Sequence, residues 1–195
     1  MWMERLRHWI AREAEVLGPE FLRVDGILNH RIEPRFIELI GEGLASAFLG
    51  KGATCVLTAE AAGNIVAYEL ARRLGVRALY AKKGDAATMI RPISRTVTSP
   101  TKGTTAQLSI CSDYLGDGDR VVIVDDFLFR GRTSAALADM VASSGATLSG
   151  FGFVIEKAFA GGRDALEQFG VPIISLAVIE SMDPDGGTIA FAGAG

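Results

Sequence analysis

Two adjacent carboxylates, Asp125 and Asp126, end an apolar run at residues 121–124 and precede a loop at residues 129–133. In an open α/β sheet, ligands bind beyond the carboxyl ends of the strands. A helix that begins close to Arg132 would offer free backbone N–H groups to a phosphate, and carboxylates are good acceptors for sugar hydroxyls. The segment therefore predicts a site for a ligand with phosphate and hydroxyl groups, and a reaction that builds positive charge beside the carboxylates.

Other kinds of site fit this segment less well. The sequence lacks the G-x-x-x-x-G-K-[ST] pattern of a P-loop. The glycine pairs at residues 41–43 and 150–152 lack the third glycine of a dinucleotide fingerprint, and no cysteine or histidine spacing suggests zinc. The plain alternative is a core strand that ends in polar residues and is followed by a helix cap.

A second chemical feature is the basic segment at residues 82–107. It carries one acidic residue, Asp85, and few large apolar side chains. Its basic residues are Lys82, Lys83, Arg91, Arg95 and Lys102. Connections of this length are uncommon in compact domains and often form lids or binding loops. The segment is therefore expected to cover an anionic ligand, with a solvated hairpin as the alternative.

Short apolar runs alternate with helical periodicity between residues 53 and 180, and these elements would position the candidate site. The expected strands lie at 53–60, 76–81, 120–126, 148–157 and 171–180. The expected helices lie at 64–75, 132–145 and 160–170. Such alternation predicts an α/β fold with a parallel sheet covered on both faces.

The ends of the chain read differently. Helical periodicity predicts an amphipathic helix at residues 2–17 and a second one that starts at Pro34, with an irregular stretch between them. A last edge strand is expected near residues 188–192. Charges interrupt the N-terminal segment too often for a signal peptide, and no apolar run reaches the length of a membrane span.

Composition narrows the possible functions. A length of 195 residues suits one domain, and 49% hydrophobic residues allow a substantial core. The net charge of −3 gives no general reason to expect nucleic-acid binding. Cys55 and Cys111 lie in apolar runs and are expected to be buried free thiols. We therefore expect a cytoplasmic protein with neither a nucleic-acid nor a membrane partner.

The thirteen-residue segment VVIVDDFLFRGRT, at residues 121–133, resembles the phosphoribosyl-pyrophosphate (PRPP) motif of type I phosphoribosyltransferases. Further segments are similar to the purine branch of this family, and most of all to its xanthine-using members. They lie at 22–34, 58–63, 97–102, 124–128 and 152–164. The resemblance implies the type I phosphoribosyltransferase fold, a central, mainly parallel sheet flanked by helices, in a single domain at 1–195. A flexible loop and a small hood, made by residues 1–52 and about 160–195, would cover the site.

The resemblance also implies roles for matching positions. Asp125 and Asp126 would be catalytic, facing the ribose hydroxyls. PRPP would be bound by Phe129, Arg130, Gly131, Arg132, Thr133, Glu60, Ala61, Ala62, Gly63, Lys82 and Lys83. The base pocket would hold Leu22, Asn29, Phe127 and Lys157. Residues 94–107, including Arg95 and Lys102, would form the flexible loop.

The implied reaction joins 5-phosphoribose from PRPP to a purine base and releases pyrophosphate. Xanthine is favoured, because an ammonium and an amide suit a base with carbonyl oxygens, which adenine lacks. Mg²⁺ would arrive with PRPP and be held mainly by the substrate, so that no dedicated metal site is expected. A homodimer is also implied, and exposed apolar residues of the first two helices would suit its interface.

The chain departs from the family pattern in two loops. Phe129, Arg130 and Arg132 stand where small residues are usual, and residues 61–62 are alanines where hydroxyl residues are common. These changes leave three alternatives open. The chain would use another base, such as hypoxanthine, guanine, adenine or a pyrimidine; bind PRPP without turnover; or act as a non-catalytic PRPP-sensing regulator.

The regulator is the weakest alternative, because residues 1–52 carry seven Lys or Arg against eight Asp or Glu and show no helix-turn-helix pattern. Single residues of the base pocket have plain alternatives as well. Asn29 would cap a turn, Lys157 would be a solvated strand end, and Leu22 would be a core residue.

Overall fold

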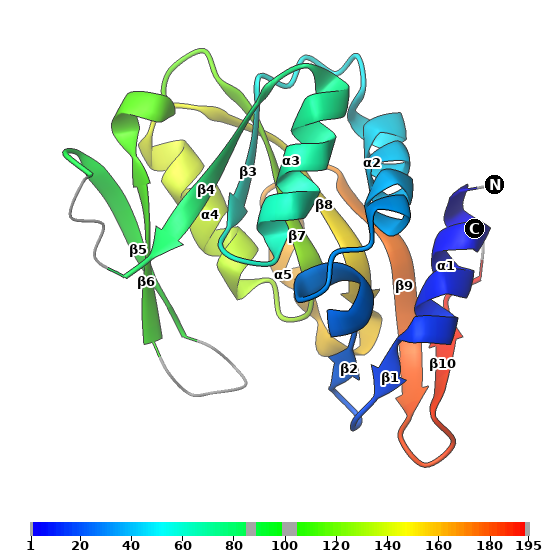
Figure 1. Ribbon diagram of the computed structural model, residues 1–195. Coiled ribbons are helices and arrows are strands. Elements are labelled where there is room, and N and C mark those ends of the chain that lie inside the picture. The colour runs from blue at the N-terminus through cyan, green and yellow to red at the C-terminus, as the bar shows by residue number, and fades with distance from the viewer. Residues whose placement is uncertain (1, 85–88, 99–104, 194–195) are drawn as a thin grey trace.

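An eight-stranded sheet forms the centre of the computed structural model, which describes residues 2–84, 89–98 and 105–193 (Figure 1). Its strands are β3 (Cys55–Ala59), β4 (Arg77–Lys83), β5 (Pro92–Thr98), β6 (Thr105–Cys111), β7 (Arg120–Leu128), β8 (Thr147–Lys157), β9 (Ile173–Asp183) and β10 (Thr188–Phe191). They lie in the order β10-β9-β8-β7-β3-β4-β6-β5. The strands from β9 to β4 pair in parallel, whereas β10, β6 and β5 pair antiparallel. The predicted α/β fold with a mainly parallel sheet is confirmed.

Helices cover both faces of the sheet. Helices α1 (Trp2–Glu13), α2 (Pro34–Phe48) and α3 (Gly63–Leu74) pack on one face, and α4 (Arg132–Ser143) and α5 (Gly162–Glu167) on the other (Figure 1). Alternate residues of β7 point to opposite faces. Val122 and Val124 thus join the core under α2 and α3, and Val121 and Ile123 the core under α4. This double burial explains the continuous apolar run before Asp125.

Local signals set the helix ends. Pro34 opens α2, where the Glu33 carboxylate accepts a hydrogen bond from the backbone N–H of Arg35 at 3.4 Å. Gly75 ends α3 with a φ of +70°, a left-handed conformation that favours glycine. Both signals are visible in the sequence, and both predicted ends are confirmed to within a residue.

The N-terminal helix is shorter than predicted. It ends at Glu13 rather than near residue 17, because β1 (Glu15–Val16) and β2 (Leu22–Arg23) pair as a small antiparallel hairpin around Gly18 and Pro19. The backbone N–H of Leu17 donates to the carbonyl of Phe21 at 2.9 Å in this hairpin. The following stretch contains a π-helical turn, Asp25–Asn29, which leads to α2.

The basic segment also differs from the expected loop. On either side of residues 99–104, strands β5 and β6 pair in register, with Ser94 opposite Ser109. Leu108 and Ile110 of β6 are buried, so that this hairpin is not simply a solvated one. Helix α5 is shorter than the predicted 160–170, since a 3₁₀ turn at Ala158–Ala160 and Gly161, with a φ of +71°, precede it.

Expectations for the last strand and for the two cysteines are met by the described residues. The last edge strand appears as β10. Cys55 and Cys111 are free and buried. No helix in the part of the chain that the structure describes is long and apolar enough to cross a membrane.

Candidate active site

A cavity of about 500 Å³ lies at the carboxyl ends of β3 and β7. It is lined by Ala59, Glu60, Ala61, Ala62, Lys83, Val97, Thr98, Ala106, Leu108, Asp125, Asp126, Phe127, Phe129, Arg130, Gly131, Arg132, Thr133 and Ser134. Most residues that the sequence singles out for PRPP, on three separate segments, thus meet in one hollow. This is the edge of the sheet where an α/β fold places its ligands.

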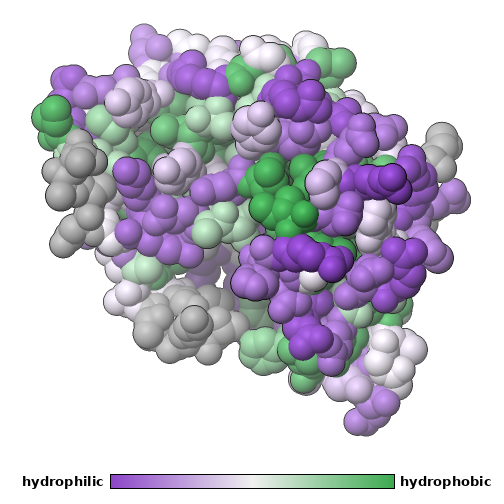
Figure 2. All heavy atoms as spheres, viewed as in Figure 1, coloured by the Kyte–Doolittle hydropathy of each residue, from purple (hydrophilic) through white to green (hydrophobic). Residues whose placement is uncertain are grey.

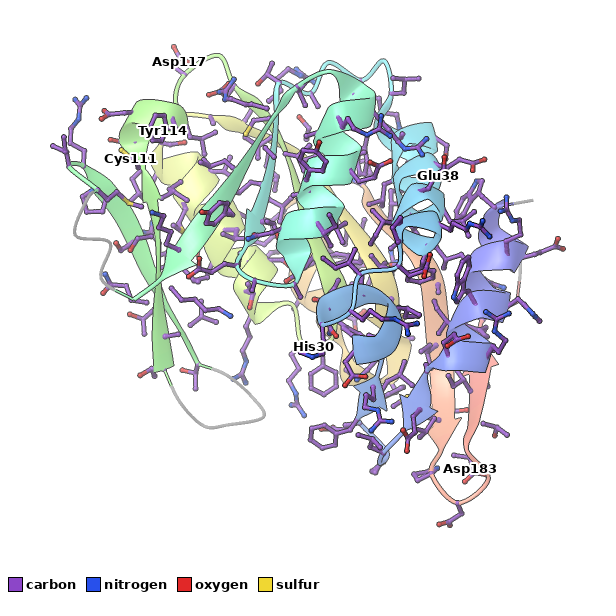
Figure 3. All side chains as sticks on the ribbon, viewed as in Figure 1. His30, Glu38, Cys111, Tyr114, Asp117 and Asp183 are labelled. Atoms are coloured by element: carbon purple, nitrogen blue, oxygen red, sulfur yellow. The ribbon has the colours of Figure 1, made fainter. Side chains whose placement is uncertain are left out.

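The two carboxylates at the end of β7 are held by hydrogen bonds. Asp125 Oδ1 accepts from the backbone N–H of Asp126 at 3.0 Å, and Asp126 Oδ1 accepts from the N–H of Phe127 at 3.0 Å. Asp126 Oδ2 accepts from Asn29 Nδ2 at 3.2 Å. Asn29 ends the π-helical turn, so that the N-terminal part of the chain meets β7 here. Figure 3 labels the next residue, His30, at the end of this turn.

The pKa of Asp125 is raised well above its ordinary value, first because the surrounding protein removes it from bulk water and then because the Asp126 carboxylate repels its charge. Lys83 acts in the opposite direction. A ligand that brings hydroxyl donors or positive charge would stabilise the ionised form of these two carboxylates. A ribose ring that becomes cationic during a reaction has both properties.

The loop after β7 forms a cradle at the start of α4. Gly131 takes a φ of +69°, and a Cβ there would lie 2.9 Å from the carbonyl oxygen of Gly162. Among the residues that the structure describes, no side chain caps the N-terminus of α4. Its first backbone N–H groups, at the positive end of the helix dipole, are therefore available to an anion in the cavity. Thr133 lines the cavity beside these groups. The arrangement suits a phosphate.

Two arginines of this loop add positive charge. Arg130 lies 3.3 Å from the Glu20 carboxylate and stacks over the Phe129 ring at 5.1 Å. Arg132 is exposed and has no hydrogen-bond or ion-pair partner among the residues that the structure describes. The departures from the usual small residues thus make the cradle more cationic.

A second loop, after β3, closes the opposite side. The peptide bond between Glu60 and Ala61 is cis. Glu60 Oε1 accepts from the backbone N–H of Lys83 at 2.6 Å, which ties this loop to β4. Lys83 lines the cavity and Lys82 does not, because successive strand residues point to opposite faces. A Cβ at Gly63 would overlap Thr58 Oγ1 and lie 2.8 Å from Asp125 Oδ1, so that a glycine is needed beside the carboxylates.

The predicted base-pocket residues lie beside the cavity rather than all within it. Lys157 Nζ donates to the carbonyl oxygen of Glu20 at 2.5 Å and lies 4.9 Å from the Phe127 ring centre and 5.3 Å from that of Phe129. Its pKa is lowered, chiefly because burial disfavours the ammonium form, while Glu20 and Asp126 raise it. Leu22 is half-buried, packs against the core and does not line the cavity.

The described residues of the segment predicted to form the flexible loop lie in two places. Arg95 Nη2 donates to Ser143 Oγ at 2.6 Å, so that its guanidinium lies against α4 instead of lining the cavity. Lys102 lies outside the described residues. Val97, Thr98, Ala106 and Leu108 line the cavity from the β5–β6 hairpin, and the first three fall within the predicted loop at 94–107.

Glu20 is the contact that sequence reasoning missed. Its carbonyl oxygen accepts from Lys157 and its carboxylate pairs with Arg130. It stands next to the Gly18-Pro19 turn, and nothing in the local pattern distinguishes it from the other acidic residues near the N-terminus. Only its place in the fold brings it to the site.

Curated relatives match nearly the whole chain, although a scan against protein-family models found no match. The xanthine phosphoribosyltransferase of Brevibacillus brevis is 44% identical and covers 94% of each chain. That of Heliobacterium modesticaldum is 43% identical over 97% of this chain and 100% of its own. Among solved structures, the adenine phosphoribosyltransferase of Thermoanaerobacter pseudethanolicus is 31% identical, with a TM-score of 0.72 over 90% of this chain and 98% of its own. The chain therefore belongs to the xanthine phosphoribosyltransferase family of type I phosphoribosyltransferases.

Proposed function

We propose that the protein is a purine-salvage enzyme that transfers the 5-phosphoribosyl group of PRPP to xanthine, forming xanthosine monophosphate and pyrophosphate. The carrying observation is that Asp125 and Asp126 line one cavity together with residues 60–62 and 129–133. The relatives named xanthine phosphoribosyltransferase, at 38–44% identity, support the same reading.

PRPP would span the cavity. Its 5′-phosphate would lie in the cradle at 129–133, where the α4 N-terminus and Arg132 supply positive charge. Its pyrophosphate would lie against the loop at 60–63 and Lys83. The ribose hydroxyls would then face Asp125 and Asp126, whose oxygens are good acceptors.

The base would lie between Phe127 and the N-terminal segment. Lys157 and Asn29 are both donors, and xanthine offers carbonyl oxygens to accept from them. Phe127 offers a flat apolar surface against which a purine can stack. A base without these oxygens would leave the largely buried ammonium of Lys157 with the Glu20 carbonyl oxygen but without an acceptor on the base, which is the basis of the proposed preference.

Mg²⁺ is proposed as the cofactor, carried in with PRPP. Among the described residues, no group of three or more His, Cys, Asp or Glu forms a metal site. Asp125, Asp126 and Glu60 nevertheless line the cavity with oxygens only, the donors that Mg²⁺ takes, and this ion usually retains water and substrate oxygens as ligands. Asp125 and Asp126 would hold it through its waters. When bound, it would neutralise the charge of the departing pyrophosphate.

In the proposed reaction, the bond between the ribose C1 and the pyrophosphate oxygen breaks, and its electron pair leaves with pyrophosphate. The bond from a ring nitrogen of the base to C1 forms, and the proton of that nitrogen passes to solvent. Asp125 and Asp126 stabilise the positive charge on the sugar, and the β5–β6 hairpin helps to exclude water. We assign no residue as a general base.

The remaining parts of the proposal concern the assembly. Residues 1–52 and about 160–195 would form the base-binding hood. The contacts of Asn29 with Asp126 and of Glu20 with Lys157 support its N-terminal part. Figure 2 shows apolar side chains gathered near the centre of one face, where Ile32 lines a hollow between α2 and α3. A homodimer would cover these side chains. A cytoplasmic location suits the two free cysteines, because thiols stay reduced there.

Pyrophosphate release tests the proposal, measured with Mg²⁺ and PRPP against xanthine, guanine, hypoxanthine and adenine separately. We expect kcat/KM to be highest for xanthine. Lys157→Met should reduce that preference, whereas Lys51→Met, an exposed site remote from the cavity, should not. A preference for another base would support the proposed reaction but contradict the assignment of Asn29 and Lys157 to a xanthine pocket. Tight PRPP binding without turnover on any base would favour the alternative of a non-catalytic PRPP-sensing regulator.

A further inference from the structure

The loop proposed to hold the 5′-phosphate lies directly on the first turn of α5. A Cβ on Gly162 would overlap the carbonyl oxygen of Phe129 and lie 2.9 Å from its carbonyl carbon. From the other side, a Cβ on Gly131 would lie 2.9 Å from the carbonyl oxygen of Gly162. The backbones of the two segments are thus in contact without intervening side chains. A shift of Gly162 must therefore move the phosphate loop.

Helix α5 is too short to hold Gly162 in place by itself. It spans six residues, Gly162–Glu167, and an isolated helix of this length is not stable. Arg163 anchors it instead. Its Nε donates to Glu156 Oε1 at 2.9 Å and its Nη2 to Glu156 Oε2 at 2.6 Å. Its Nη1 also donates to the carbonyl oxygen of Ile173 at 3.2 Å.

Glu156 is placed to connect this anchor to the phosphate loop. It lies on β8, in register with Leu128, the last residue of β7 before that loop. The side chain is 2% exposed, and the bidentate guanidinium is its ion-pair partner. A buried carboxylate needs such a partner, because an unpaired charge is strongly unfavourable in the protein interior. The ion pair therefore fixes Arg163, and with it Gly162, at the level where the loop begins.

We propose that Glu156 and Arg163 are positioning residues for PRPP: their ion pair holds Gly162 beneath residues 129–133 and thereby sets the affinity of that loop for the 5′-phosphate. Neither residue lines the cavity, so that both act through the backbone of α5. The inference rests on the proposed function. It implies that loss of the pair weakens ligands with a 5′-phosphate and spares pyrophosphate and the base.

Arg163→Lys and Glu156→Gln test this selectivity. Lysine retains the charge but lacks the planar fork, and glutamine retains the shape but lacks the charge. We expect the KM for PRPP and the inhibition constant of ribose 5-phosphate to rise about tenfold. The inhibition constant of pyrophosphate, the KM for xanthine and kcat should stay unchanged. Equal weakening of ribose 5-phosphate and pyrophosphate would overturn the inference.

A double variant separates positioning from stability. Glu156→Leu with Arg163→Met removes both charges and leaves apolar side chains, a change that often restores stability. We expect it to recover thermal stability without recovering the affinity for ribose 5-phosphate. Recovery of both would reduce the pair to a stability element. Ser175→Ala is the matched control, because it removes only the 3.4 Å contact to Arg163 Nη2, and it should bind ribose 5-phosphate normally.

Calorimetric binding of ribose 5-phosphate distinguishes failure of this inference from failure of the proposed function. An unmodified protein that turns over no base, yet binds ribose 5-phosphate more tightly than Arg163→Lys does, would reject the enzyme and support the positioning pair. Turnover by the unmodified protein, with unaltered binding of ribose 5-phosphate in the variants, would support the enzyme and reject the positioning pair. An unmodified protein that does not bind ribose 5-phosphate would reject both.

Discussion

Asn29 Nδ2 donates a hydrogen bond to Asp126 Oδ2 at 3.2 Å, although 97 residues separate the two in the sequence. The bond joins the turn before α2 to the end of β7. It also leaves Asp126 with one oxygen held by an amide side chain and the other by the Phe127 N–H. The orientation of a proposed catalytic carboxylate thus depends on the N-terminal segment.

Replacing this amide should therefore impair the reaction. Asn29→Asp would put a second anion beside Asp126, and we expect kcat/KM for xanthine to fall about 10- to 100-fold, the range for loss of a hydrogen bond to a charged group. Steady-state kinetics of the purified variant measure it. Asn29→Ser, which retains a donor, should lose less. Wild-type kinetics in Asn29→Asp would contradict the assignment.

The carboxylates themselves should act on the chemical step. Asp125→Asn and Asp126→Asn remove a charge that is proposed to stabilise the cationic sugar, and kcat should fall by about 10²–10³. Asp125→Asn should also be at least as thermally stable as the unmodified protein, because its carboxylate is poorly solvated and repelled by Asp126. An unchanged kcat in both variants would reject their catalytic role.

Gly63→Ala should disturb both the fold and the site. The new methyl group would overlap Thr58 Oγ1 and crowd Asp125 Oδ1, and overpacking of this kind costs about 1–3 kcal/mol of stability. Urea unfolding measures the loss. Gly116→Ala is the control, because the nearest atom to its Cβ, the carbonyl oxygen of Ser144, is 3.8 Å away. Equal stability of the two variants would show that the close approach at Gly63 relaxes freely.

The unusual arginines of the phosphate loop should strengthen PRPP binding. Arg132→Ala is expected to raise the KM for PRPP about tenfold, the effect of losing one charge-assisted contact, with little change in stability because its side chain is exposed. Arg130→Ala should also leave stability nearly unchanged, since its pair with Glu20 is about half exposed on each side. An unaltered KM in Arg132→Ala would place the phosphate elsewhere. Arg12→Ala, on α1, serves as the control.

Cys55 should be unreactive in the folded protein. Burial raises the pKa of its thiol from 9.0 to about 11, because the interior disfavours the thiolate, the reactive form. Iodoacetamide at neutral pH should therefore label Cys55 only after denaturation. A folded pKa above the unfolded one also means that the stability contributed by this group is present below pH 9.0 and is lost as the pH rises to about 11. Rapid labelling of Cys55 in the folded protein would contradict its burial.

The sequence predicts the centre of the fold well, because each inner strand is an apolar run and each following helix shows its own periodicity. The β5–β6 hairpin is harder to predict. Small polar residues such as Ser94 and Ser109 pair there through the backbone, and they interrupt the few apolar residues, so that neither strand is a continuous apolar run. The end of α1 depends on the β1–β2 hairpin, whose two-residue strands are too short to give a pattern.

The candidate site shows the same division. Asp125, Asp126 and the loop at 129–133 are contiguous, and their chemistry is legible in the sequence. The role of Glu20 cannot be predicted from the sequence, because its contacts with Lys157 and Arg130 form only when the N-terminal segment packs against the rest of the fold. Local pattern also cannot tell that Lys83 faces the cavity and Lys82 does not, since this depends on the orientation of β4.

The hydrogen bond from Lys157 to the carbonyl oxygen of Glu20 spans 137 residues of sequence. During synthesis, the N-terminal segment leaves the ribosome long before β8. The Glu20 carbonyl oxygen therefore lacks this hydrogen bond until Lys157 has been synthesised. The proposed base pocket would therefore be among the last features that a growing chain can complete. Nascent chains that stop before β8 should retain no purine-binding capacity, even where helices α1 to α3 have already formed.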